Sequence, residues 1–154
     1  DNGKFSFDLT YYLGSGDDDV TDTDIKSYNV LWQNEHRRFG TIDAFKGANV
    51  QATTLHFDWK IGRLVSTGIH GVMASVVEQD DRSNGIFPPG PMSDLGTLSN
   101  SIGIGGDCYL NYFYNQNLNF QFSTSVFSPG DYFTTVSVLN EPMIRLYLMM
   151  ALRL

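Results

Sequence analysis

The sequence predicts an all-β protein, an antiparallel up-and-down sheet that is part of a transmembrane β-barrel. Three observations predict this fold class: period-two alternation in six runs, a polar face poor in lysine and glutamate, and short links that alternate with long loops. Of the 154 residues, 18% are charged, below the quarter or so that is usual in soluble domains. No run approaches about eighteen apolar residues, which excludes a transmembrane helix.

The first three runs cover residues 4–14, 53–61 and 64–78. One face of the first run is apolar, with Phe5, Phe7, Leu9, Tyr11 and Leu13. The matching face of the second run carries Leu55, Phe57, Trp59 and Ile61. The third run is less regular, with Val65, Ile69, Met73 and Val77. Because successive side chains of a strand point to opposite faces, each run is interpreted as a strand with one apolar face.

The last three runs cover residues 102–114, 118–126 and 144–154. The apolar face of the fourth run holds Ile102, Ile104, Cys108, Leu110, Tyr112 and Tyr114. The fifth run has Leu118, Phe120, Phe122 and Val126 on this face. The sixth alternates most clearly, with Ile144, Leu146, Leu148, Met150, Leu152 and Leu154. Five aromatic residues near strand ends are expected in the interfacial girdle: Tyr11, Tyr12, Trp59, Tyr112 and Tyr114.

Charged and histidine side chains inside the runs all fall on the polar parity. A charge on the lipid-facing parity would cost about 2–4 kcal/mol near the midplane. The residues expected to line a pore are Lys4, Asp8, His56, Asp58, Lys60, His70, Asp107, Arg145 and Arg153. The alternative is a soluble barrel or sandwich with its apolar face inward. Solvent-facing strands usually carry many lysines and glutamates, whereas this polar face is mostly Ser, Thr, Asn, Gln and Gly.

The connections divide into two kinds within a single barrel segment, 1–154. Long loops are expected on the extracellular side at about 15–48, 80–100 and 129–141, and short periplasmic turns at 62–63 and 115–117. Single-chain barrels begin at about eight strands, so six cannot close alone. We expect the C-terminal part of a larger barrel, and the alternative is that several chains share one barrel.

Charge and cysteine content limit the partners. The net charge of -7 argues against nucleic acid, and the single cysteine, Cys108, excludes an internal disulfide. Twelve of the seventeen acidic residues lie in the three long loops, where they would repel an anionic polymer. The expected partners are membrane lipid, lipopolysaccharide and a passing solute or polysaccharide. No cofactor is expected.

Three groups of residues are candidate sites. Asp17 and Asp19 are weak Ca²⁺ candidates within an acidic run, but the run lacks the spacing of an EF-hand, which favours a solvated loop. His56 and His70 share the polar face, where two imidazoles alone make a poor metal site. A charged pore ring of Arg145, Arg153, Lys60 and Asp58 stays open against simple cross-strand hydrogen bonding. No Ser and His meet on the lipid-facing side, so an enzyme is not expected.

Several motifs follow one another in a recognisable order: Ser15-Gly16-Asp17-Asp18, Tyr28-Asn29-Val30-Leu31, His36-Arg37-Arg38-Phe39-Gly40, Ile42-Asp43-Ala44-Phe45, Gly47-Ala48-Asn49 and Phe127-Ser128-Pro129-Gly130-Asp131-Tyr132-Phe133. In this order the chain resembles the C-terminal portion of the alginate export family. The loop-motif residues are Asp17, Asp18, Asp19, His36, Arg37, Arg38 and Asp43.

The resemblance implies a barrel of roughly eighteen strands in the bacterial outer membrane. It further implies a channel that passes a polysaccharide or another solute. The alternative function is a structural or partner-binding barrel that anchors a surface or envelope assembly.

Overall fold

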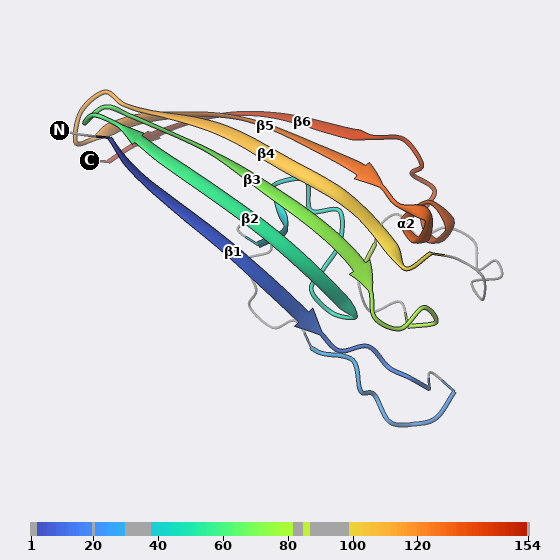
Figure 1. Cartoon of the computed structure of the whole chain (residues 1–154). Helices are drawn as coiled ribbons and strands as arrows, with labels where there is room; N and C mark the ends of the chain where they lie inside the picture. The colour runs from blue at the N-terminus through green and yellow to red at the C-terminus, as the bar shows by residue number, and fades with distance from the viewer. Residues whose placement is uncertain (1–2, 20, 30–37, 82–84, 87–98, 154) are drawn as a thin grey trace.

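The computed structural model describes residues 3–19, 21–29, 38–81, 85–86 and 99–153; His36 and Arg37 of the loop motif lie outside them. In the described part, six strands form one antiparallel sheet in the order β1-β2-β3-β4-β5-β6 (Figure 1). The strands are β1 (Lys4–Gly14), β2 (Val50–Ile61), β3 (Val65–Val76), β4 (Ser101–Phe113), β5 (Leu118–Pro129) and β6 (Met143–Leu152). Each strand pairs with its neighbours in sequence, which confirms the predicted all-β, up-and-down fold class.

The short helix α2 (Asp131–Val136) lies in a stretch that the sequence predicts to be a plain loop. It begins after Gly130, whose carbonyl accepts the Thr134 amide at 3.0 Å. Six residues are too few for a stable isolated helix. Packing holds it instead, since Tyr132, Phe133 and Val136 are buried. No helix in the described residues is long and apolar enough to cross a membrane.

The apolar parity of the strands faces outward. Phe5 on β1 is 74% exposed and Leu148 on β6 is 75% exposed. Large apolar side chains recur along the same face of every strand, among them Phe57, Ile69 and Phe122. An apolar surface of this extent is unusual for a soluble monomer and is what a lipid-facing barrel wall requires.

Ile102 is the exception, because the sequence places it on the outward face and the structure buries it completely, at 0% exposed. The pairing of β3 with β4 shifts between Ala74 and Ser75, so that Ile102 has no partner of its own. Gly103 beside it has φ +149°. This β-bulge turns Ile102 towards the inner face, and a bulge has no signature in the alternation.

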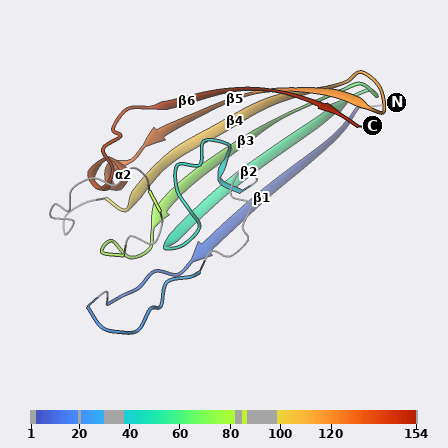
Figure 2. The same ribbon diagram turned by 180° about the vertical axis from the view of Figure 1, so that it is seen from behind.

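The two ends of the sheet differ, as Figures 1 and 2 show. At the turn end, the chain makes the short connections 62–64 and 114–117, and both chain ends lie there (Figure 1). At the loop end, the long connections and α2 gather, and the segment 38–49 lies beneath the curve of the sheet. The buried core is confined to the loop end, where it combines residues of this segment, β2 to β5 and α2.

Candidate functional site

Six polar residues form a transverse row, one from each strand, on the inner face of the sheet. Each is the direct cross-strand partner of the next, in the order Asp8, His56, His70, Asp107, Ser125 and Arg145. We call this set the polar row. Five of its members are predicted pore-lining residues, and the register places them at one level of the wall. Their role in lining a pore stays a prediction.

The centre of the polar row is buried. The Nδ1 atom of His70 lies 3.3 Å from Oδ2 of Asp107, and their side chains are only 4% and 10% exposed. The rings of His56 and His70 lie 4.7 Å apart. The Nε2 atom of His70 has no hydrogen-bond partner within the described residues. A carboxylate this far from water needs hydrogen-bond donors around it.

Those donors come from a loop. We call residues 38–49 the inner segment. The Thr41 amide lies 3.3 Å from Oδ2 of Asp107, and the Thr41 hydroxyl lies 3.2 Å from Oδ1. The same hydroxyl also contacts the Ser125 hydroxyl, and the guanidinium of Arg145 donates to the Thr41 carbonyl. One loop residue therefore contacts three neighbouring strands, β4, β5 and β6.

Gly40 permits this close approach. Its φ of +94° is a conformation that favours glycine. A Cβ atom added there would lie 2.8 Å from Oδ2 of Asp107. On the wall opposite, a Cβ atom added at Gly105 would lie 3.1 Å from both Phe127 and Val72. Gly40 therefore lets the inner segment approach β4, whereas Gly105 makes room for side chains of the neighbouring strands β3 and β5.

Aromatic rings hold the inner segment along the rest of its length. Phe39 packs edge-on against Tyr12, with 5.3 Å between ring centroids, and lies tilted against Phe45, with 4.9 Å between centroids. Phe127 on β5 then lies 6.2 Å from Phe45 and 5.4 Å from Phe133 of α2. This chain of rings runs from β1 to α2 across the inner face.

Tyr12 is therefore not a girdle residue, contrary to the expectation from the sequence. Its hydroxyl donates to the Gly47 carbonyl at 2.7 Å, and the guanidinium of Arg38 lies 4.6 Å above its ring. Position 12 has the inner parity of β1, where the ring meets the inner segment rather than the lipid interface. Arg38 of the loop motif is thus positioned by a cation–π contact.

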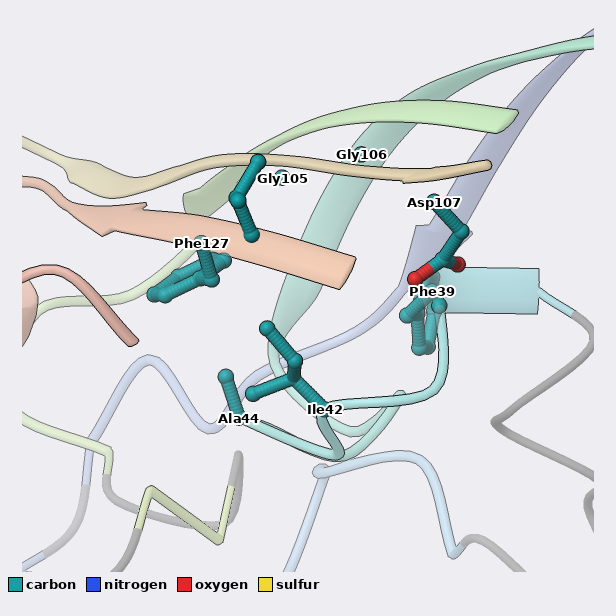
Figure 3. A pocket seen from close by; sticks show the side chains of 9 residues that line it. Phe39, Ile42, Ala44, Gly105, Gly106, Asp107 and Phe127 are labelled. Atoms are coloured by element: carbon teal, nitrogen blue, oxygen red, sulfur yellow. The ribbon is translucent and has the colours of Figure 1, made fainter. Parts of the chain in front are cut away.

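A small recess opens between the inner segment and the wall (Figure 3). It is narrow and partly open to solvent. Phe39 and Ile42 line it on one side, and Gly105 and Phe127 on the other. Figure 3 shows the Asp107 carboxylate beside Phe39 at one end. The recess is mostly apolar, with one charged group at its edge.

Asn49 joins the first long loop to the second. It is fully buried, has φ +52°, and its side-chain amide donates to the carbonyls of Glu78 at 2.7 Å and Asp81 at 2.5 Å. Its side-chain oxygen accepts the Glu78 amide at 2.7 Å. Asp81 in turn accepts the Asp17 amide at 2.9 Å and the Ser27 hydroxyl at 2.5 Å.

The acidic run at residues 17–19 is occupied by protein partners. Lys26 lies 2.5 Å from Asp18, and this contact lowers the pKa of Asp18. The Asp19 carboxylate accepts the hydroxyl of Thr21 at 2.6 Å, which lowers the pKa of Asp19. Within the described residues, no three His, Cys, Asp or Glu side chains are grouped as metal ligands. The geometry gives no support to the weak Ca²⁺ candidates Asp17 and Asp19.

The four residues weighed as a charged ring do not share one level of the wall. Arg145 pairs with Ser125 in the polar row, whereas Asp58 and Lys60 pair with Gly68 and Ser66 at successive levels nearer the turn end. Lys60 also pairs with Lys4. Arg153 follows β6, and its amide donates to the Asn117 carbonyl in a turn. The basic members thus spread along the wall instead of encircling it.

The remaining loop-motif residue, Asp43, is exposed and has φ +58° in the turn of the inner segment. Sequence reasoning missed Thr41, Ser125, Asn49 and Asp81 as functional candidates. The one signal available was that Thr41 and Asn49 lie within or beside the recognised motifs. Nothing in the sequence alone indicated their partners.

Comparison with known proteins identifies the family of this chain. No curated protein and no solved structure matches the chain. The family described as alginate export matches residues 2–138, a range that includes the inner segment and β1 to β5. A match to this family indicates an outer-membrane location and, in general terms, an export or porin-like role. Since the match spans most of the chain and confirms the resemblance in the loop motifs, this protein belongs to the alginate export family.

Proposed function

We propose that this chain forms part of the wall of an outer-membrane channel through which a polar solute or a polysaccharide passes. The observation that carries the proposal is the opposite character of the two faces. Large apolar side chains point outward, while charged, hydroxyl and amide groups point into the concave side. In a closed barrel this arrangement puts lipid outside and water inside.

The wall below the polar row supports a polar, hydroxyl-bearing solute. Its inner residues include Ser66, Asn111, Gln121 and Ser123, which are neutral hydrogen-bonding groups. Asn111 donates to the Ser66 hydroxyl at 3.1 Å, so some of these groups bond across strands. Groups of this kind exchange hydrogen bonds readily with sugar hydroxyls, and they impose no strong charge requirement.

Charge along the described wall differs from end to end. The described residues near the turn end include four basic side chains, Lys4, Lys60, Arg63 and Arg153, and one acidic side chain, Asp58. The described loops at the other end hold eleven acidic and three basic residues. An anionic polymer would be attracted at the turn end and repelled at the loop end. A neutral or mixed-charge solute meets no such opposition.

As a channel wall, the protein would contact lipid, the periplasm and the cell exterior. Bacterial outer-membrane lipid contacts the outward face, and the acidic loops bind lipopolysaccharide through divalent ions. Turns lie in the periplasm and long loops outside the cell. The rest of the barrel is supplied by further strands of the same chain or by other chains. We assign the protein no catalytic activity, no cofactor and no nucleic-acid partner.

The proposal is tested with the full-length protein in planar bilayers and in liposomes. We expect stable ion conductance, and swelling of liposomes in neutral sugars at rates that fall with solute size. Comparison of neutral oligosaccharides with uronate oligosaccharides of equal length identifies the preferred charge. A folded protein that stays silent in both assays contradicts the channel. A stable partner that co-purifies with a silent protein would favour the alternative role as an envelope anchor.

A further inference from the structure

We propose that Thr41 and Asp107 form a latch that holds the inner segment in the lumen and so limits the size of the solute that passes. The inference rests on the proposed channel function and names the residues that set its aperture. In this scheme Asp107 is a positioning residue, because it acts through Thr41 and need not touch the solute.

The contact between Thr41 and Asp107 lies deep along the inner face of the wall. The polar row crosses β1 to β5 near the middle of each strand, well below the loops that connect them. Thr41 reaches this level and contacts Asp107, Ser125 and Arg145 on three adjacent strands. The backbone around Thr41 therefore occupies space at mid-height on the inner side of the wall, where it narrows the passage.

The hydrogen bonds of Thr41 are directional. The aromatic contacts of Phe39 and Phe45 favour burial of the inner segment, but contact between rings depends less steeply on direction than a hydrogen bond does. The two Thr41 donors and the Asp107 carboxylate have defined geometry, at 3.3 and 3.2 Å. Hydrogen bonds to a charged acceptor are stronger than neutral ones. They fix the register of the loop against the wall.

The wall has an acceptor and free space at the position that the loop occupies. A carboxylate whose side chain is only 10% exposed is costly unless donors surround it. Besides His70, the loop residue Thr41 supplies both an amide and a hydroxyl. Gly40 leaves room beside Oδ2 that a Cβ atom would fill. Without Thr41 the Asp107 carboxylate would lose two of its donors.

The test uses the full-length protein with Cys108 replaced by serine, since Cys108 is exposed on the outer face. Ala44→Cys places a reporter thiol on the inner segment, and a membrane-impermeant maleimide measures how often this segment leaves the wall. Thr41→Val should speed labelling by about tenfold or more, the factor expected for one lost hydrogen bond to a charged group. Asp107→Ala should speed it by at least as much, because it removes the contact with the Thr41 amide as well. The same variants should raise single-channel conductance and admit larger sugars.

Two further variants separate a latch from a general structural effect. The combined Asp107→Ala, Thr41→Val protein should show less than the sum of the two single effects, because the contact between the Thr41 hydroxyl and Asp107 is lost in both single variants. Thr41→Ser keeps the hydroxyl and should restore the original rate. The matched control is Thr10→Val, which removes a hydroxyl that donates to Asp8 at 2.7 Å on the same face without contacting the inner segment in the described structure. It should leave labelling and conductance unchanged.

The outcomes are distinguishable. Unchanged labelling in both Asp107→Ala and Thr41→Val, or additive effects in the double variant, would overturn the latch even if the channel conducts. Faster labelling in a protein that never conducts would support the latch as a structural contact and overturn the channel function on which its proposed role depends. Faster labelling together with larger conductance supports both.

Discussion

The loop end and the turn end of the sheet are built from the same six strands, yet their inner faces differ in kind. On β2, Val50 and Ala52 are buried at the loop end, whereas Asp58 and Lys60 nearer the turn end stay in contact with solvent. The inner segment and α2 cover the first region, and no described loop covers the second. The inner face is therefore closely packed at the loop end and is an open polar surface at the turn end.

Stability therefore depends mainly on the loop end of the wall, and selectivity can depend on the turn end. Buried aromatic contacts and loop hydrogen bonds at the loop end stabilise one arrangement. At the turn end, substitutions disturb few contacts, so exposed charges there can vary to suit the solute. The polar row lies at the boundary between the two ends. There Asp107 is part of the wall and also binds Thr41 of the inner segment.

The largest expected effect is at the loop-end core. Phe45 is 2% exposed and contacts the rings of Phe39 and Phe127. Phe45→Ala should lower the free energy of unfolding by about 3–5 kcal/mol, because it leaves a cavity among rigid neighbours. Guanidinium unfolding from lipid vesicles measures this loss. Phe113→Ala, on the inner face at the more exposed turn end, should cost clearly less; equal losses would break the comparison between the two ends.

The next effect concerns the junction of the loops. Asn49→Ala removes the side chain that bonds the backbone of Glu78 and the carbonyl of Asp81. Leaving these groups unpaired should cost about 1–3 kcal/mol. Asn49→Gly loses the same bonds but accepts φ +52° without strain, so it should be the milder variant. Limited proteolysis of the loops checks the ranking, and an alanine variant as protected as the original protein would contradict it.

At the turn end we expect a smaller change in the free energy of unfolding but a clear change in ion selectivity. Lys60→Glu replaces an exposed charge beside Lys4, and stability should change by no more than about 0.5 kcal/mol. The zero-current potential in a KCl gradient should shift towards cation selectivity, because the positive charge at this mouth is reduced. Lys46→Glu, exposed at the already acidic loop end, should shift it less. The reverse order would show that the loop end controls selectivity.

The smallest effect is a pH dependence in the first loop. The contact with Lys26 lowers the pKa of Asp18 and raises the pKa of Lys26. The lowered pKa means that the contact is fully present above the ordinary Asp value of 3.8 and is lost as pH falls through the lower value. The raised pKa means that it persists below the ordinary Lys value of 10.5 and is lost as pH rises beyond it. Carboxyl carbon chemical shifts of Asp18 measure the acid limb, and a midpoint at or above 3.8 would contradict it.

Much of the fold could be predicted because the signal is local. The runs around Phe7 and Leu146 alternate within a few residues, and the structure confirms that these side chains face outward. The inward orientation of Ile102 could not be predicted, because the bulge depends on the register between β3 and β4. The helix α2 could not be predicted either, because only burial of Tyr132 and Phe133 makes so short a helix stable.

The sequence predicted the strand residues of the candidate site but not the loop residues that contact them. His70 and Asp107 were expected on the inner face, and the structure places them side by side. Their loop partner Thr41 is 66 residues from Asp107 in the chain, and Asn49 is 32 residues from Asp81. No periodic pattern connects positions so far apart through irregular loops.

The apolar face of each strand follows from the sequence alone, because a side chain's face depends only on its parity along an extended backbone. The inward turn of Thr41 and its contact with Asp107 follow only from the three-dimensional fold. That contact depends on the path of a loop, on Gly40 at a positive φ and on rings contributed by distant strands. Such contacts form when the whole sheet has curved, and no local stretch of residues encodes them.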